Sequence, residues 1–345
     1  MNRILLVWLG ALGDIVHAIP VAAALRREFP AARIDWLVSA KHRAILDLVP
    51  TLDRRIVIDG GRSPAVTTLF GAVRDVRRSG YDVAIDLQGL VKSAVLARSS
   101  GADRVIGFAA SYLRERLARP FYTDVYDPGC QGIYDPRETR HVVEINLGLL
   151  EPLGVPKATP EFPIDRVDSA LAADVRRQTA GRYALLNPGA QWPNKRWPPA
   201  RFAQVAAALR ERHGLMSVAV WGHGERELAE DIAAHSAGAA LVSPPASIAD
   251  LVGLIRGAAV MVSGDTGPTH MAAALGTPIV GIFGPTRPSR NGPWSKEDVT
   301  VSRAEVCRCH HLRQCTERRM CLLDIEVDEV LEAIEQRLGR KPNRA

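Results

Sequence analysis

Short apolar runs alternate with amphipathic stretches along most of this 345-residue chain. Apolar runs of about four to eight residues, bounded by turn residues, are typical of buried strands, and longer stretches with a helical period are typical of helices. Strands that alternate with helices predict a parallel sheet covered by helices on both faces. The alternation runs through the chain twice, so we predict an α/β protein with two doubly wound, Rossmann-like domains.

The first half of the chain carries the first series of elements. We predict strands at Ile4–Leu9, Ile34–Val38, Ile56–Ile58 and Val83–Leu87, and helices at Val16–Phe29, Leu69–Arg78, Leu90–Arg98 and His141–Leu153. The segment Asp124–Arg137 is rich in Asp, Pro and Gly, which predicts a loop. The Pro-rich, polar segment Ala158–Asp168 predicts a linker between the domains.

The second half repeats the pattern. We predict strands at Tyr183–Leu186, Met216–Trp221, Ala240–Leu241, Val260–Ser263 and Ile279–Phe283, and helices at Phe202–Arg212, Arg226–His235, Ile248–Arg256 and Thr269–Leu275. The predicted domains are residues 1–165 and 166–326. The remaining residues, 327–345, form a helix (Asp328–Leu338) and a tail that can pack on either domain, the N-terminal one included. Ligands of such sheets bind outside the carboxyl ends of the strands, so we expect the site in a cleft between two facing domains.

The composition restricts the partners. The net charge is +6 and the isoelectric point about 9.2, which favours an anionic partner. There is no dense Lys/Arg tract and no interleaving of aromatic and basic residues, so the sequence argues against nucleic acid. No apolar stretch reaches the ~18 residues of a membrane-spanning helix. Asp14 and His17 interrupt the first apolar run, which predicts a strand and helix rather than a signal peptide.

Two polar motifs follow predicted strands in the first domain. In the motif Gly10–Asp14, the glycines Gly10 and Gly13 permit a tight turn, and Asp14 lies at or near the start of a helix. Asp14 is then either a helix N-cap or a general base facing the cleft. The third glycine of the dinucleotide fingerprint is missing. In the motif Asp86–Ser93, Gln88, Lys92 and Ser93 are candidates for contact with an anionic acceptor, or else form a capped turn.

Two motifs of the second domain are predicted to meet a nucleotide. In the motif Asn187–Trp197, Lys195 and Arg196 suit a diphosphate, although a solvated basic loop is the alternative. We expect Trp197 to anchor this loop in the core. After the next strand, Glu225 is a candidate acceptor for ribose hydroxyls, or else ordinary acidic decoration of a helix start.

The motif Ser263–His270 is the most informative. A strand leads into a glycine-rich turn whose following helix directs free N–H groups back at the turn, which predicts a phosphate site that needs no metal. Asp265, Thr266 and Gly267 lie in this turn. His270 lies one helical turn later and is interpreted as a ligand contact, with a core histidine as the alternative.

The cysteines form a late cluster. Cys307, Cys309, Cys315 and Cys321 lie near two histidines, His310 and His311, while Cys130 stands alone. The cluster is a candidate zinc site, but its spacing is not that of a finger or ribbon, and reduced structural cysteines or a thiol pair remain open. The chain has no phosphate-loop lysine motif, no His-Glu-x-x-His and no Gly-x-Ser-x-Gly. We therefore expect a reaction without metal or cofactor.

The ordered set of motifs resembles glycosyltransferase family 9, the ADP-heptose:lipopolysaccharide heptosyltransferases. The resemblance rests on Gly10-x-x-Gly13-Asp14 with Pro20, Asp86–Ser93, Asn187–Trp197, Gly264–His270 and the mid-chain segment His141–Leu147, and spans Ile4 to about Val330. Two departures exist: Ala190-Gln191 stands where heptosyltransferase I often has Thr-Thr, and the cysteine cluster is absent from some members.

The resemblance implies a GT-B fold, with the acceptor on the N-terminal domain and the nucleotide sugar on the C-terminal one. It implies an inverting, metal-independent transfer of heptose from ADP-heptose to a lipopolysaccharide core or related anionic glycolipid. By the same resemblance, Asp14 is the general base, Lys195 contacts donor phosphate and Glu225 the ribose. Asp265, Thr266, Gly267 and His270 contact the phosphates and the heptose.

The alternatives are another nucleotide sugar or acceptor, and a non-catalytic nucleotide-binding protein. A nucleotide-sugar epimerase or dehydrogenase would need a dinucleotide fingerprint and a Tyr-x-x-x-Lys pair, and the sequence has neither. We expect a cytoplasmic enzyme with peripheral contact to the inner face of the cytoplasmic membrane.

Overall fold

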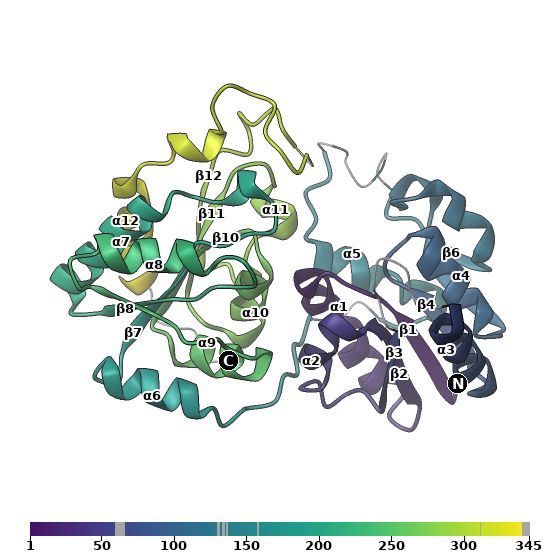
Figure 1. Cartoon of the computed structure of the whole chain (residues 1–345). Coiled ribbons are helices and arrows are strands. Elements are labelled where there is room, and N and C mark those ends of the chain that lie inside the picture. Colours follow the sequence, from purple (N-terminus) through teal and green to yellow (C-terminus); the bar gives the residue numbers. More distant parts are fainter. Residues whose placement is uncertain are drawn as a thin grey trace. The chain divides into compact units, whose positions relative to one another are not determined.

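The chain divides into two compact units, Met1–Asp165 and Arg166–Ala345. The structure is a computed structural model, drawn in Figure 1, and it describes residues 1–58, 66–129, 132, 135, 137–156, 159–310 and 312–339. Cys130 and His311 lie outside the described residues. Each unit is built around its own parallel sheet of six strands.

The first unit has the strand order β3-β2-β1-β4-β5-β6. Its strands are β1 (Arg3–Val7), β2 (Arg33–Ser39), β3 (Arg54–Ile58), β4 (Val83–Asp86), β5 (Arg104–Phe108) and β6 (Asp124–Tyr126). Its helices are α1 (Leu12–Glu28), α2 (Arg43–Leu46), α3 (Val66–Arg78), α4 (Val91–Ser99) and α5 (Val142–Gly148). Short 3-10 turns are η1 (Ala40–His42), η2 (Ala110–Tyr112), η3 (Arg116–Phe121) and η4 (Glu151–Leu153). The central strand β1 is apolar and fully buried from Ile4 to Val7, as a strand covered on both faces must be.

The second unit repeats this topology, with the strand order β12-β11-β10-β7-β8-β9. Its strands are β7 (Tyr183–Asn187), β8 (Met216–Ala219), β9 (Ala240–Val242), β10 (Val260–Gly264), β11 (Ile279–Phe283) and β12 (Val299–Ser302). Its helices are α6 (Ala170–Gln178), α7 (Pro199–His213), α8 (Arg226–His235), α9 (Ile248–Gly257), α10 (Gly267–Leu275), α11 (Pro288–Asn291) and α12 (Val327–Gly339), with 3-10 turns η5 (Pro193–Lys195) and η6 (Cys321–Asp324). The prediction of two Rossmann-like α/β units is confirmed.

Each sheet has one topological switch point, where the chain order reverses. It lies between β1 and β4 in the first unit and between β7 and β10 in the second. Loops that leave the carboxyl ends of such neighbouring strands diverge to opposite faces and leave a crevice for a ligand. The polar motifs that follow β1, β4, β7 and β10 therefore lie where each sheet binds ligands.

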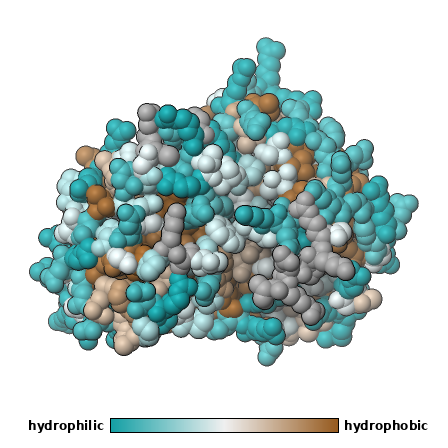
Figure 2. Space-filling model, turned by 180° about the vertical axis from the view of Figure 1, so that it is seen from behind, coloured by the Kyte–Doolittle hydropathy of each residue, from teal (hydrophilic) through white to brown (hydrophobic). Residues whose placement is uncertain are grey.

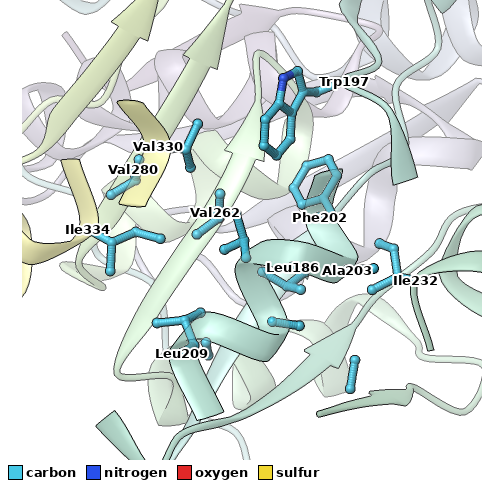
Figure 3. Close-up of a cluster of buried hydrophobic side chains, with 14 of the residues drawn as sticks. Leu186, Trp197, Phe202, Ala203, Leu209, Ile232, Val262, Val280, Val330 and Ile334 are labelled. Carbon is cyan, nitrogen blue, oxygen red and sulfur yellow. The ribbon is translucent and has the colours of Figure 1, made fainter. Parts of the chain in front are cut away.

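The final helix packs on the second sheet. Val330 and Ile334 of α12 belong to the same buried apolar cluster as Val262 of β10 and Val280 of β11, as Figure 3 shows. Between the two alternatives left open for this helix, the structure has it on the second unit. The same cluster holds Trp197, which is 2% exposed and donates its indole N–H to the Ile325 carbonyl oxygen at 3.0 Å, so its predicted role as a core anchor is confirmed.

Some predicted boundaries were wrong. The segment predicted as a loop from Asp124 begins with the strand β6, which pairs with β5 through Phe108 and Tyr126. The strands β5 and β12 and the helix α6 were not predicted. β6 and β12 are only half buried, so neither carries the fully apolar run that marks a central strand.

Figure 2 shows one face of the protein, on which patches of hydrophobic residues (brown) are interrupted by hydrophilic residues (teal). Scattered apolar residues of this kind need no partner to explain them. Within the described residues, no helix combines the length and the apolar character needed to span a membrane.

Candidate functional site

Three charged or titratable side chains meet at the switch point of the second sheet. Lys195 lies in η5, in the loop that leaves β7, and Asp265 directly follows the neighbouring strand β10. The Lys195 Nζ lies 2.5 Å from Asp265 Oδ2, and His270 Nε2 lies 3.0 Å from Asp265 Oδ1. The sequence named all three residues, and the structure brings them together across 75 positions of the chain, from Lys195 to His270.

This cluster is buried and strongly polar. Burial by itself raises the pKa of the Asp265 carboxyl, but the Lys195 ammonium and the hydrogen bond from His270 outweigh it and hold that pKa well below its usual range. The Lys195 Nζ also lies 4.5 Å from the centre of the Trp192 ring, a cation–π distance. Asp265 therefore stays ionised, and we interpret it as the group that positions Lys195 and His270 rather than as a direct phosphate ligand.

A network of hydroxyl groups shapes the turn that follows β10. The Asn187 side-chain amide donates to Ser263 Oγ and to Thr266 Oγ1, both at 2.9 Å. The Thr269 hydroxyl donates to the Gly264 carbonyl oxygen at 2.5 Å, which ties the first turn of α10 back to β10. Thr266 is the N-cap of α10 and Gly267 its first residue. The start of this nine-residue helix directs main-chain N–H groups toward the turn, which suits an anion.

Glu225 lies beside this site, in the loop that follows β8. Its carboxylate accepts from Arg196 Nη2 at 3.3 Å and from the Gly222 main-chain N–H at 3.2 Å. A Cβ atom at Gly189 would lie 2.1 Å from Glu225 Oε2, so the carboxylate packs directly on the glycine of the Asn-Pro-Gly motif. The loops after β7 and β8, which are adjacent strands, thus form one polar surface.

In the first unit, Asp14 lies at the start of α1, after β1. The N-cap of α1 is Ala11, and Asp14 is the third helical residue, so the interpretation of Asp14 as an N-cap is wrong. Its carboxylate pairs with Arg114 at 3.1 Å and is 27% exposed. Gly13 is buried inside the same helix. A Cβ atom at Gly10 would lie 2.4 Å from the His42 ring, so this turn needs a glycine for close approach.

The motif after β4 is organised by a buried carboxylate. Asp86 accepts hydrogen bonds from the hydroxyls of Ser93 at 2.9 Å and Tyr122 at 2.7 Å, and from the Gln88 main-chain N–H at 2.9 Å. Burial raises the pKa of Asp86 to about 6, and these hydrogen bonds limit the rise. Ser93 is buried and committed to Asp86, as the capped-turn interpretation predicted, while Lys92 is exposed. The Gln88 side chain accepts from the Leu9 N–H at 3.0 Å, which links the loops after β4 and β1.

The late cysteines are reduced and lie in pairs. Cys309 Sγ and Cys315 Sγ are 3.1 Å apart, and Cys307, Cys309, Cys315 and Cys321 are all free thiols. In the described part of the chain, no three His, Cys, Asp or Glu side chains are grouped as a metal ion would need. The arrangement therefore favours the thiol-pair interpretation over the zinc interpretation.

Two contributors to the site were missed in the sequence. Arg114, which pairs with Asp14, and Trp192, which packs on Lys195, were not singled out for these roles. Arg114 lies beyond β5, a strand that was not predicted, so the rule that ligands bind at strand ends was not applied there. Trp192 stood inside a motif already noted, but no local pattern says which way its ring turns.

Comparisons with known proteins give the family of this chain. A family model described as glycosyltransferase family 9 (heptosyltransferase) matches residues 70–320. Lipopolysaccharide heptosyltransferase 1 of Pseudomonas aeruginosa is 32% identical over 91% of this chain and 87% of its own length. Lipopolysaccharide heptosyltransferase 1 of Escherichia coli K12 is 27% identical over 89% of this chain and 93% of its own length.

The solved structures agree on the fold. A glycosyl transferase family 9 protein from Veillonella parvula superposes with a TM-score of 0.80 at 23% identity, covering 99% of this chain and 98% of its own. The E. coli heptosyltransferase WaaC with ADP gives a TM-score of 0.72 at 23% identity, covering 98% of both chains. The fold and the family match thus define a glycosyltransferase with two Rossmann-like units of the GT-B class. The chain belongs to glycosyltransferase family 9, the heptosyltransferases.

Proposed function

We propose that this enzyme transfers heptose from ADP-heptose to a lipopolysaccharide core or related anionic glycolipid, with inversion at the anomeric carbon and without a metal ion. The relatives named above are lipopolysaccharide heptosyltransferases. Solved structures of WaaC contain ADP or ADP-2-deoxy-2-fluoro heptose, and the latter superposes with a TM-score of 0.73 at 24% identity. These likenesses support the choice of donor and acceptor.

The observation that carries the proposal is the Lys195–Asp265–His270 cluster beside the start of α10. A diphosphate needs a cation and several N–H donors, and this surface offers the Lys195 ammonium, the first-turn N–H groups of α10 and the Thr266 hydroxyl. As ADP leaves, negative charge grows on its phosphate, and donors already held in place stabilise that charge without reorganising. Glu225 would accept from the ribose hydroxyls.

Asp14 is proposed as the general base. It is held by Arg114 but remains partly exposed, so an acceptor hydroxyl can reach it. In the proposed reaction, that hydroxyl gives its proton to Asp14 while its oxygen attacks the anomeric carbon, and ADP departs from the opposite side. A positioned general base typically contributes about 10²–10⁴-fold to the rate.

The remaining assignments complete the proposal. Residues 1–165 would bind the acceptor, with Gly13, Gln88 and Lys92 near it, and residues 166–326 would bind the nucleotide sugar. Ser93 would act only through Asp86, because its hydroxyl is buried. We propose a cytoplasmic enzyme that meets its glycolipid by peripheral contact with the inner membrane, and the net charge of +6 supports that contact.

The test combines nucleotide binding with turnover. We expect ADP to raise the thermal midpoint more than UDP, GDP or dTDP do, since at equal concentration a ligand that binds the folded state more tightly stabilises it more. Asp14→Asn should keep the ADP shift and lose about 10²–10⁴-fold in turnover of ADP-heptose. Asp103→Asn, which changes an exposed carboxylate on the turn before β5, is the matched control and should be unaffected. Near-normal turnover by Asp14→Asn would show that Asp14 is not the general base. A preference for another nucleotide would show that ADP-heptose is not the donor.

A further inference from the structure

Two of the clustered cysteines, Cys309 and Cys315, have sulfur atoms that lie close together. The Sγ–Sγ distance is 3.1 Å, and a disulfide bond is about 2.05 Å, so a small movement joins the two atoms. We propose that Cys309 and Cys315 form a reversible dithiol, a modification site that hydroperoxides convert to an intramolecular disulfide. This site is separate from the proposed transferase chemistry and does not rest on it.

Hydrogen bonds prepare Cys309 as the thiolate of the pair. The Thr316 main-chain N–H donates to Cys309 Sγ at 3.2 Å, and the Thr316 hydroxyl lies 3.6 Å from the same sulfur. Together with the neighbouring thiol of Cys315, these donors lower the pKa of Cys309 to about 7. The thiolate, not the thiol, is the nucleophile in sulfur chemistry, so this pair holds a reactive form near neutral pH.

An oxidant can reach the pair through an open hollow. Cys315 lines a hollow of about 500 Å³, together with Asn194 and the segment from Glu317 to Met320. Cys309 is 1% exposed, does not line this hollow, and contacts Cys315 through its sulfur. A small hydroperoxide therefore meets Cys315 first, and Cys309 is in place to resolve the product.

The reaction balances in two steps. Burial raises the pKa of the Cys315 thiol, so its sulfur attacks one oxygen of hydrogen peroxide as its proton passes to the Cys309 thiolate 3.1 Å away. The O–O bond breaks, which gives a sulfenic acid on Cys315, and the hydroxide that leaves takes the proton from Cys309 and becomes water. The Cys309 thiolate then attacks that sulfur and displaces the second hydroxide, which takes a proton and leaves as water. Two thiols lose two electrons, and one peroxide becomes two waters. An external dithiol reverses the change.

The other two cysteines are poorly suited to the same chemistry. Burial, and a contact with the Cys307 thiol, raise the pKa of Cys321 to about 12, so this sulfur stays protonated. Cys321 also packs against Gly284, where a Cβ atom would lie 3.1 Å from its sulfur. The structure thus predicts one reactive pair and one inert pair within the same cluster.

The segment between the two cysteines is hydrogen-bonded to the loop that carries Lys195. The Leu312 carbonyl oxygen, between the two cysteines, accepts from the Asn194 side-chain amide at 2.8 Å. Asn194 is 3% exposed and directly precedes Lys195. A disulfide between Cys309 and Cys315 would therefore link the two ends of the segment that contacts this loop.

Arginines between the cysteines allow each cysteine to be recovered on its own peptide. Cleavage after Arg308, Arg313 and Arg318 separates Cys309 (peptide 309–313) from Cys315 (peptide 314–318). The same digestion leaves Cys307 on peptide 304–308 and Cys321 on peptide 320–337. The purified, reduced full-length chain is treated with about one equivalent of hydrogen peroxide, blocked with iodoacetamide and mapped by mass spectrometry without reduction.

We expect a linked species of peptides 309–313 and 314–318 that dithiothreitol removes, and carbamidomethylated Cys321 recovered after denaturation. Cys315→Ser should abolish the link and leave Cys309 alkylated, while Cys321→Ser, the matched control, should leave the link intact. Three results would each overturn the proposal: a link that involves Cys307 or Cys321 instead, irreversible oxidation without any link, or a stoichiometric metal ion that holds the four thiols in the purified chain.

Discussion

Asp265→Asn is the substitution that most directly tests how the second unit is held together at its site. In the structure, Asp265 accepts from Lys195 at 2.5 Å and from His270 at 3.0 Å, and its side chain is 4% exposed. The variant keeps the shape of the side chain but removes its charge. Lys195, whose side chain is only 15% exposed, is then left without its counter-charge.

The expected cost follows from that burial. Removing one partner of a buried ion pair typically costs about 3–5 kcal/mol, because the other charge stays desolvated. The residual exposure of Lys195 and the acceptor oxygen that Asn retains bring the expectation to about 2–4 kcal/mol. For a unit of this size, about 3 kcal/mol lowers the thermal midpoint by roughly 6–12 °C.

The pH dependence supplies a second check. The folded pKa of Asp265 is depressed, so the stability it contributes is present above its unfolded value and is lost as pH falls through the folded value. The difference between the parent and Asp265→Asn should therefore be constant from about pH 5 to pH 8 and shrink below about pH 4, where the unfolded carboxyl takes up a proton.

The assay is urea unfolding of the parent, Asp265→Asn, Lys195→Met and the double variant. Lys195→Met removes the cation but keeps an unbranched side chain near the Trp192 ring. If the pair is coupled as the geometry indicates, the double variant should lose less stability than the sum of the single ones, by about 1–3 kcal/mol. A loss below about 0.5 kcal/mol in Asp265→Asn, or strictly additive losses, would refute this account.

Two further predictions concern the glycine beside Glu225 and the buried carboxylate of the first unit. Gly189→Ala should displace the flexible Glu225 carboxylate at a stability cost of about 1 kcal/mol, because the new Cβ would lie 2.1 Å from Glu225 Oε2. It should also weaken ADP binding, and its effect should not add to that of Glu225→Ala. Additive effects of the two substitutions in isothermal titration would argue against this contact. The folded pKa of Asp86, raised to about 6, lies above its unfolded value, so stability should fall by up to about 3 kcal/mol as pH rises from about 4 to 6. In urea unfolding, this dependence of stability on pH should vanish in Asp86→Asn. An unchanged pH dependence in the variant would contradict the prediction.

The sequence alone determined the type and the order of most elements. Central strands such as β1 and β7 contain buried runs of mostly apolar residues, Ile4–Val7 and Tyr183–Leu186, because helices cover both of their faces, and these runs are visible in the sequence. Edge strands such as β12 are half buried, so no comparable pattern marks them. The same reasoning located the polar motifs at strand ends, since a residue that follows a buried strand lies at the carboxyl edge of the sheet.

Only the tertiary structure decided which of those polar residues meet. Asp14 pairs with Arg114, and Lys195 pairs with Asp265 across 70 positions. Such pairs depend on the order of strands in the sheet and on the direction of each side chain, and neither is encoded in local periodicity. The structure also separated Ser93, which is buried against Asp86, from Lys92, which is exposed, although the two are adjacent in sequence. A local sequence pattern reflects only the neighbours of a residue along the chain. A binding surface is formed by residues that become neighbours only when the sheet forms.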